Sequence, residues 1–276
     1  SVPNFRIKKL AIVGFGMIGA SIAKAVRKKL LAEKIVGIDT SIEHLRYGVD
    51  QGLIDEQVDR VPKDAELVAF CAPMASFGEI IESFELHMGV FFDVCSVKTP
   101  LAEVLSGMSR DSTARFVPCH PIAGSEKTGP ENGQERLFEN SLVAITPLAH
   151  TSKDALTTVE SLWSALGAKT LRMSADEHDK ALAVTSHLPH FLSFAYMLGF
   201  DPKLEALTGG GYRDFTRIAA ADPELWWGIF QMNRDEILRA LEKFRLNIDA
   251  LEDMLVADDH HAGIEALADA VRRKLG

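Results

Sequence analysis

The sequence predicts an α/β protein with a mainly parallel sheet, followed by an all-helical domain. Short, nearly continuous apolar runs alternate with helical patterns as far as residue 172. This alternation is typical of a parallel sheet whose two faces are covered by helices. Beyond residue 173 the strand-like runs stop and only helical spacing remains. We therefore expect two domains, comprising residues 1–172 and 173–276.

The candidate strands are short apolar runs bounded by Gly, Pro or polar residues. They lie at residues 10–14, 35–39, 67–71, 90–94, 115–118, 141–146 and 169–172. Apolar residues at helical spacing (Ile18, Ile22, Val26) follow the first run, and further helices are expected at residues 41–48 and 152–166. The second domain is expected to contain helices at residues 175–200, 223–232, 234–255 and 259–275, with a break at the glycines of residues 209–211.

Composition excludes several classes of protein. The chain has 276 residues, of which 30 are Lys or Arg and 39 are Asp or Glu, so its net charge is −9. This balance argues against a general nucleic-acid-binding protein, which usually has a basic face, and against a polybasic membrane anchor. No uninterrupted apolar run reaches the ~18 residues that suggest a membrane span. Three cysteines are too few for a disulfide framework and indicate a reducing, cytoplasmic environment.

The clearest motif is Gly14-Phe-Gly-Met-Ile-Gly19, which follows the first predicted strand and opens the first predicted helix. In this context the motif predicts dinucleotide binding. The first glycine allows a tight turn, the second lets the backbone approach the pyrophosphate, and the third permits close packing of helix and strand. The helix N-terminus adds amides and the positive end of its dipole. The first domain is therefore expected to be Rossmann-type.

Asp39 lies 20 residues after Gly19, at the end of the second predicted strand. A carboxylate there can accept hydrogen bonds from both ribose hydroxyls of NAD and would repel the 2′-phosphate of NADP. We therefore expect NAD as the cofactor. The expected cofactor-binding residues are Gly14, Gly16, Met17, Ile18, Gly19, Asp39, Ala72 and Pro73.

Four polar clusters could carry chemistry. They lie at residues 93–98, 120–126, 186–190 and 209–217, and the first two follow predicted strands. Ligands of open α/β sheets bind outside the carboxyl ends of the strands. From their residue types, these clusters indicate a histidine base near a hydroxyl, with arginines for a carboxylate.

Each candidate also has a simpler interpretation. His120 could simply lie at the end of a strand without a catalytic role, and Arg213 could be a solvated surface charge. His187 and His190 lie three residues apart, but no third ligand or H-E-x-x-H pattern accompanies them, so we expect no metal. Cys119 neighbours His120, yet adjacent strand residues point to opposite faces, so a thiol nucleophile paired with this histidine is not expected.

Three segments together resemble the prephenate/arogenate dehydrogenase family of tyrosine biosynthesis. They are His-Pro-Ile-Ala-Gly-Ser-Glu at residues 120–126, Ser-His-Leu-Pro-His at residues 186–190 and Asp-Phe-Thr-Arg at residues 214–217. The resemblance runs from the glycine motif to Trp226. It implies an NAD-dependent enzyme that oxidises the ring hydroxyl of a cyclohexadienol, with loss of the ring carboxylate. It also implies that the helical domain forms a homodimer.

The resemblance implies roles for individual residues. His120 would be the catalytic base that takes the proton from the 4-hydroxyl, and Ser96 would be the second catalytic residue, hydrogen-bonding near that hydroxyl and the nicotinamide. Arg217 would hold a substrate carboxylate bidentately, and His187 would position the substrate. The remaining expected substrate-binding residues are Glu126, Asp214 and Arg213.

The substrate implied by the resemblance is a small anion, although the chain itself is acidic. We therefore expect a local cationic pocket around Arg217, and modest electrostatic steering that salt weakens. Residues expected to contribute to this pocket are Lys98, Lys127 and Arg213.

The main expectation is oxidative decarboxylation of prephenate to 4-hydroxyphenylpyruvate. Arogenate dehydrogenase and dual cyclohexadienyl dehydrogenase activities stay open, because the two substrates differ only in a keto or amino side chain. More remote alternatives are a dehydrogenase of hydroxy acids or imines and a non-catalytic NAD-sensing module. The glycine motif begins at residue 14 and the chain ends after its last predicted helix, so we expect no fused chorismate mutase or regulatory domain.

Overall fold

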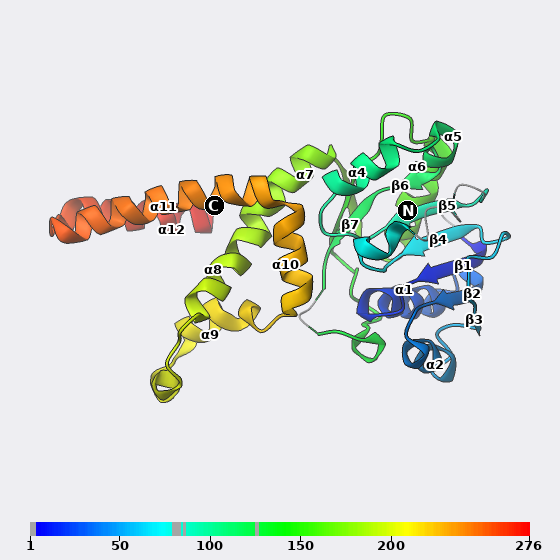
Figure 1. Ribbon diagram of the computed structural model, residues 1–276, viewed down its shortest axis with the longest axis horizontal. Helices are drawn as coiled ribbons and strands as arrows, with labels where there is room; N and C mark the ends of the chain where they lie inside the picture. Colours follow the sequence, from blue (N-terminus) through cyan, green and yellow to red (C-terminus); the bar gives the residue numbers. More distant parts are fainter. Residues whose placement is uncertain (1–3, 79–83, 85–86, 125–126) are drawn as a thin grey trace. The chain divides into compact units, whose positions relative to one another are not determined.

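The computed structural model describes residues 4–78, 84, 87–124 and 127–276 (Figure 1). The chain divides into two compact units. Unit 1 comprises Ser1–Asp179 and Ala220–Met232, and unit 2 comprises Lys180–Ala219 and Asn233–Gly276. The expected domain boundary between residues 172 and 173 stays a prediction.

Unit 1 is built on a six-stranded, entirely parallel sheet with the strand order β3-β2-β1-β4-β5-β6. This confirms the predicted Rossmann-type sheet, and the order reverses between β1 and β4, where such sheets bind ligands. The strands are β1 (Ile7–Val13), β2 (Ala32–Ile38), β3 (Glu56–Gln57), β4 (Leu67–Phe70), β5 (Val90–Asp93) and β6 (Phe116–Val117). The sequence did not predict β3, because its two polar residues carry no apolar pattern.

A second sheet corrects the expectation of a single sheet. β7 (Cys119–Ile122) pairs antiparallel with β8 (Leu142–Ile145), and β8 pairs parallel with β9 (Lys169–Arg172). Pro118 stands between β6 and β7. Because proline has no N–H to donate to a ladder, the main sheet ends there and the chain continues into the second sheet. His120 consequently lies on a strand rather than in a loop after one.

Apolar clusters cover both faces of the main sheet. Leu10 and Ile12 of β1 belong to one cluster and Ala11 and Val13 to the other, because successive strand residues point to opposite faces. Figure 1 shows helices on both sides of the strands. Among the described residues, the helices of unit 1 are α1 (Met17–Lys28), α2 (Ile42–Asp50), α4 (Thr99–Ser106), α5 (Arg110–Thr113), α6 (Lys153–Ala165) and α10 (Pro223–Met232). Helix α7 (Ala175–Leu182) carries the chain into unit 2.

Unit 2 is helical, as predicted, but the expected helix over residues 175–200 is interrupted. A π-helical turn, Ala183–His187, separates α7 from α8 (Leu188–Met197). The chain continues through a 3₁₀ turn (Pro202–Leu207), α9 (Gly210–Thr216), a second 3₁₀ turn (Arg217–Ala219), α11 (Arg234–Val256) and α12 (His260–Leu275). π-Helical turns are rare and often mark functional positions.

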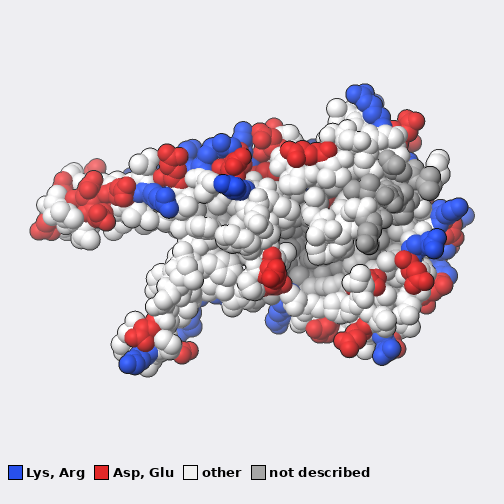
Figure 2. All heavy atoms as spheres, in the orientation of Figure 1, with Lys and Arg blue, Asp and Glu red and all other residues white. Residues whose placement is uncertain are grey.

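The long helices α11 and α12 lie side by side (Figure 1). Several apolar side chains of α11 are exposed: Leu246, Leu251 and Leu255 are 63%, 44% and 81% exposed. On the face shown in Figure 2, acidic and basic side chains are interspersed along this part of the chain. Among the described residues, no helix combines the length and apolar character of a membrane-spanning segment.

Candidate active site

The turn after β1 depends on two of its glycines. Gly14 has a φ of +91°, and a Cβ there would lie 2.5 Å from the amide nitrogen of Ala72. A Cβ on Gly19 would lie 2.2 Å from the carbonyl oxygen of Gly14. Gly14 therefore lets the turn approach the end of β4, which Ala72 and Pro73 follow. Gly19 lets α1 pack closely on the turn.

Gly16 serves a different purpose, because no atom lies within 4 Å of the Cβ position that a side chain would occupy there. It is the N-cap of α1, and no side chain of the described residues caps the helix through a hydrogen bond. The first turn, which begins with Met17 and Ile18, also contains no acidic residue. An open, uncapped helix N-terminus at the point where the strand order reverses fits the pyrophosphate of a dinucleotide.

Asp39 closes this site from the end of β2. Its Oδ2 accepts a hydrogen bond from the amide of Phe15 at 2.6 Å, and its Oδ1 accepts from the amide of Ser41 at 2.8 Å. The carboxylate therefore holds the glycine turn to the end of β2. His44 of α2, which the sequence did not single out, lies 3.8 Å from the same carboxylate.

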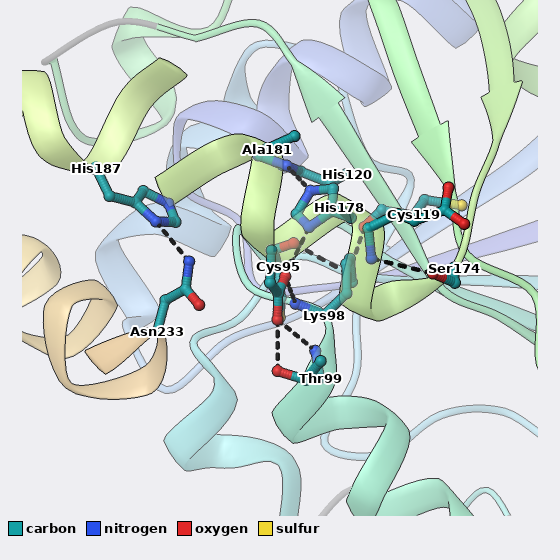
Figure 3. A network of polar contacts seen from close by, with 12 residues as sticks. Cys95, Lys98, Thr99, Cys119, His120, Ser174, His178, Ala181, His187 and Asn233 are labelled. Atoms are coloured by element: carbon teal, nitrogen blue, oxygen red, sulfur yellow. Dashed lines mark hydrogen bonds and ion pairs between the residues drawn. The ribbon is translucent and has the colours of Figure 1, made fainter. Parts of the chain in front are cut away.

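A buried ion pair organises the polar cluster after β5. The ammonium of Lys98 lies 2.5 Å from Oδ2 of Asp93, and both side chains are 0% exposed. The same ammonium donates to the carbonyl oxygens of Cys95 at 3.0 Å and Cys119 at 2.6 Å. Figure 3 shows these contacts between the end of β5 and β7. The two carbonyls belong to the residues that immediately precede the predicted catalytic residues.

Ser96 and His120 are thus brought together through their backbones. The carboxylate of Asp93 reinforces this arrangement, because it accepts from the amides of Cys95 at 2.9 Å and Cys119 at 3.0 Å. Both Ser96 and His120 are half-buried. The expectation that Lys98 helps to attract an anionic substrate is corrected here: its charge is buried and paired with Asp93.

The cysteines of unit 1 are free thiols. Cys119 is buried, whereas its neighbour His120 is half-buried, as alternation along a strand requires. Burial raises the pKa of Cys71, Cys95 and Cys119 well above the ordinary range for thiols. Thiols in this state are poor nucleophiles, in agreement with the sequence-based expectation for Cys119.

His178 and Asp179 of α7 complete the surroundings of His120, and the sequence analysis missed both. Nδ1 of His120 lies 2.8 Å from Nε2 of His178, and Nδ1 of His178 lies 2.7 Å from Oδ1 of Asp179. The two residues are buried. In the sequence they look like ordinary members of an acidic first helical turn. They are revealed only by the contact of His178 with His120, 58 positions earlier in the sequence, and by the contact of Asp179 with His178.

In unit 2, His187 lies at the end of the π-helical turn and is buried against Asn233, the N-cap of α11. The side-chain amide of Asn233 donates to Nδ1 of His187 at 3.0 Å. This contact ties the π-helical turn to the long helix (Figure 3).

His190, one turn further along α8, is half-buried and lies in the electrostatic field of Arg217. Its Nδ1–H donates to the carbonyl of Ser186 at 2.8 Å. Burial, and secondarily the positive charge of Arg217, lower the pKa of His190, although the bond to Ser186 opposes the shift. Ser193 donates to the carbonyl of Phe215 at 2.9 Å and so joins α8 to α9. His190 is therefore neutral near neutral pH and can act as a hydrogen-bonding partner.

Two exposed arginines, Arg213 on α9 and Arg217 in the 3₁₀ turn that follows it, lie in the segment for which the sequence suggests a carboxylate site. Arg213 and Arg217 are four residues apart on one helical face and both are exposed, as is Asp214. Glu126 lies outside the described residues, and Lys127 is exposed.

Among the described residues no group of three or more His, Cys, Asp or Glu side chains could hold a metal ion.

Unit 1 combines a glycine turn that fits a dinucleotide with the serine hydroxyl of Ser96 after β5 and the imidazole of His120 on β7. This set can bind a nucleotide and accept a proton from a hydroxyl. Unit 2 offers cationic groups and a neutral histidine, which can bind a carboxylate.

Family comparisons agree with this chemistry. Residues 22–172 match the family model for the prephenate dehydrogenase nucleotide-binding domain, and residues 174–269 match that for the prephenate dehydrogenase dimerization domain.

Individual relatives extend over nearly the whole chain. The prephenate dehydrogenase of Bacillus subtilis is 31% identical over 91% of this chain and 71% of its own length. The cyclohexadienyl dehydrogenase of Zymomonas mobilis is 28% identical over 97% of this chain and 95% of its own length. The crystal structure of prephenate dehydrogenase from A. aeolicus, in complex with hydroxyphenyl propionate and NAD+, is 32% identical, has a TM-score of 0.90 and covers 99% of both chains.

Proposed function

Because this chain belongs to the prephenate dehydrogenase family, we propose that it oxidises prephenate to 4-hydroxyphenylpyruvate in tyrosine biosynthesis. The observation that carries the proposal is the buried Lys98 ammonium, which donates to the carbonyls of Cys95 and Cys119 and so holds together the segments that carry Ser96 and His120. Bound NAD would supply the hydride acceptor. A non-catalytic NAD-sensing role receives no support from the family assignment.

His120 is proposed as the base. The reaction removes a hydride from the ring carbon that bears the hydroxyl and breaks the bond to the ring carboxylate, which leaves as CO₂. The electron pair of that bond makes the ring aromatic, and the product keeps its phenolic proton. The base therefore takes the hydroxyl proton and later returns it to the phenolate oxygen. A histidine suits this role, because its pKa lies near neutral pH.

Ser96 is proposed to hydrogen-bond to the same hydroxyl. Its segment is held by the bond from the amide of Cys95 to Asp93 and by the bond from Lys98 to the carbonyl of Cys95. A hydroxyl on a backbone held at two neighbouring points can orient a substrate oxygen without a large entropic cost.

Arg217 is proposed to bind a substrate carboxylate, with Arg213 adding positive charge and Asp214 and Glu126 orienting the pocket. His187, the histidine that the resemblance predicts to position the substrate, is buried against Asn233. The neighbouring His190, which was not predicted as a site residue, is the one that the charge of Arg217 reaches. We therefore propose His190 as the substrate-contacting histidine and His187 as the residue that positions its helix.

NAD rather than NADP is proposed as the cofactor. The carboxylate of Asp39 lies at the end of β2, anchored by the amides of Phe15 and Ser41. A fixed negative charge there favours ribose hydroxyls and repels a 2′-phosphate. The A. aeolicus relative was crystallised in complex with NAD+, which supports the same choice.

The second candidate function is the oxidation of arogenate, alone or together with prephenate. It is favoured by the similarity to the cyclohexadienyl dehydrogenase of Zymomonas mobilis. The two substrates share the ring and its carboxylate and differ in the side chain. The roles proposed for His120, Ser96 and Arg217 are the same for both.

The test is to follow NADH or NADPH absorbance with each substrate and each cofactor. We expect turnover of prephenate with NAD, and His120→Asn to lose roughly 10²–10⁴-fold in kcat while its affinity for NAD stays unchanged. His261→Asn, at a site that is 88% exposed on α12, is the matched control and should behave as the unmodified chain does. Folded, NAD-binding protein that turns over neither substrate would overturn the proposed function.

A further inference from the structure

A chain of polar contacts runs from His120 into the interior of unit 1. His120 contacts His178 at 2.8 Å, and His178 contacts Asp179 at 2.7 Å. The two imidazole rings meet edge to face, with centroids 5.0 Å apart and an interplanar angle of 75°. Figure 3 shows His120 and His178 next to each other in the network that also contains Lys98 and Thr99. The exposed fraction of His178 is 0% and that of Asp179 is 1%.

Asp179 is held in its ionised form. Its Oδ1 accepts from the amide of Lys98 at 2.8 Å, and its Oδ2 accepts from the amide of Thr99 at 2.8 Å and from the Thr99 hydroxyl at 2.5 Å. Burial alone would raise the pKa of this carboxyl, but the bonds from His178, Thr99 and the two amides outweigh burial and lower it. The N-terminal end of α4 adds a favourable dipole.

An ionised Asp179 decides which nitrogens carry protons along the chain. A carboxylate can only accept hydrogen bonds, so Nδ1 of His178 carries a proton and donates a hydrogen bond to Asp179. Nε2 of a neutral His178 must then accept, and Nδ1–H of His120 is the donor. This tautomer of His120 has its basic lone pair on Nε2. A base in this state is ready to take a proton from a hydroxyl.

We propose that His178 and Asp179 are positioning residues that set the tautomer of His120 and share the proton that it takes from the substrate. This inference rests on the proposed role of His120 as base. When Nε2 of His120 takes the hydroxyl proton, Nδ1–H of His120 can pass its proton to Nε2 of His178. The hydrogen-bonded row of His120, His178 and Asp179 thus gains one proton, and the positive charge moves onto His178, next to the carboxylate of Asp179. The reverse transfer returns the proton to the phenolate oxygen.

The surrounding charges favour this direction of transfer. Lys98 donates its amide to Asp179, but its ammonium is already paired with Asp93 on β5. The neighbouring thiol of Cys119 is neutral, because burial raises its pKa. Asp179 is therefore the anion in direct contact with His178, and their attraction is strong in this buried setting. The arrangement resembles the acid–histidine part of a catalytic triad, with one imidazole inserted.

Substitutions at position 178 test the relay. His178→Gln keeps a carbonyl that can accept from Nδ1–H of His120 and an amide that can donate to Asp179. His178→Leu has a similar size and keeps neither. We expect the Leu variant to lose roughly 10²–10³-fold in kcat and the Gln variant only about tenfold, with the KM for NAD unchanged in both.

Asp179→Asn tests the tautomer directly. When the amide nitrogen that this substitution introduces takes the place of Oδ1, it donates to Nδ1 of His178, so that His178 donates to Nδ1 of His120 and the proton of His120 moves to Nε2. A comparable reversal in a serine protease lowers kcat by about 10⁴. ¹⁵N NMR of the histidine-labelled chain with NAD should show a protonated Nδ1 on His120, exchanged for a protonated Nε2 in Asp179→Asn. Comparison with His120→Asn assigns the signals.

Ser174→Ala is the matched structural control. Its hydroxyl accepts from the amide of Glu177 at 3.0 Å at the start of α7. Its backbone carbonyl accepts from the amide of His178 at 3.0 Å, and alanine keeps that bond. We expect Ser174→Ala to leave the NMR signals and the pH dependence of kcat unchanged. In the variants at 178 and 179 the acidic limb of that profile should move to lower pH, because imidazolium on His120 loses its stabilising partner.

Equal kcat values for the Gln and Leu variants, or a protonated Nε2 on His120 in the unmodified chain, would overturn the relay. If the unmodified chain turns over neither prephenate nor arogenate, the proposed function fails. The NMR measurement still decides whether His178 and Asp179 set the tautomer, so the two failures are distinguishable.

Discussion

The ammonium of Lys98 lies 2.5 Å from the carboxylate of Asp93, and neither side chain is exposed to solvent. Both partners also bind the backbone of Cys95 and of Cys119. The ammonium of Lys98 donates to the two carbonyls, and the carboxylate of Asp93 accepts from the two amides. A single buried ion pair therefore connects the end of β5 with β7. It makes the placement of Ser96 and His120 dependent on one interaction.

Lys98→Met is expected to lower the free energy of unfolding by about 3–5 kcal/mol, because it leaves a buried carboxylate without its counter-charge. Urea unfolding measures the change. Lys9→Met is the matched control: it removes a surface pair of 2.6 Å whose acid, Asp64, is 70% exposed, and should cost no more than about 1 kcal/mol. Equal losses in the two variants would contradict the structural role assigned to Lys98.

The three motif glycines should respond differently to alanine. Gly14→Ala and Gly19→Ala would bring a Cβ within 2.5 Å and 2.2 Å of backbone atoms, so both should lower the melting temperature. Gly16→Ala meets no atom within 4 Å and should leave stability almost unchanged. Its methyl group would project into the space expected for the pyrophosphate, and the Kd for NAD should rise at least about tenfold. Thermal melts and calorimetric titration with NAD separate the two effects, and a Gly16→Ala variant with unaltered affinity would contradict the placement of the cofactor.

Asp39→Asn should weaken the discrimination between NAD and NADP. The substitution removes the negative charge but keeps an oxygen that can accept from the amide of Phe15 or Ser41. We expect the ratio of kcat/KM for NADP to that for NAD to rise by roughly 10–100-fold, the equivalent of about 1–3 kcal/mol. Asp50→Asn, an exposed carboxylate at the end of α2, is the control and should leave the ratio unchanged. An unaltered ratio in Asp39→Asn would show that another group selects the cofactor.

Arg217→Ala should chiefly raise the KM for prephenate, by at least about tenfold, because it removes a bidentate partner of a carboxylate. Arg217→Lys should not restore the affinity, since an ammonium cannot reproduce the planar fork. Arg213→Ala should have a smaller effect of the same sign. Steady-state kinetics at several ionic strengths complete the test. The KM of the unmodified chain should rise with salt, and a KM that is independent of salt would contradict electrostatic steering.

Folding stability should fall as the pH drops below the ordinary histidine pKa of 6.5, in part because of His190. Its pKa is lowered in the folded chain, so between the lowered value and 6.5 the unfolded chain binds more protons. The contribution of His190 to folding stability is therefore present above pH 6.5 and is lost as the pH falls from 6.5 through the lowered pKa of the folded chain. His190→Gln should therefore show a smaller difference in unfolding free energy between about pH 7.5 and pH 5.5. His261→Gln, at the exposed site on α12, should not change that difference.

Much of unit 1 was predictable because its signals are local. The apolar runs, the glycine spacing and the acid at the end of the second strand each lie within a few residues of the structure that they specify. The second sheet was not predictable in this way. Residues 123–141 separate β7 from β8 in the sequence, and a short apolar run does not indicate which sheet it joins. The same limit applies to the π-helical turn, which interrupts a pattern that reads as one continuous helix.

The sequence by itself determined the Rossmann-type sheet, the dinucleotide motif, the helical second part and the family. These follow from periodicity and from residues at short, regular spacings. Only the tertiary structure decided that Lys98 is a buried counter-ion rather than a substrate-binding cation, and that His178 and Asp179 stand behind His120. Those facts depend on contacts between residues up to 81 positions apart. Such contacts arise from the way in which the strands and helices pack, and no local pattern encodes them.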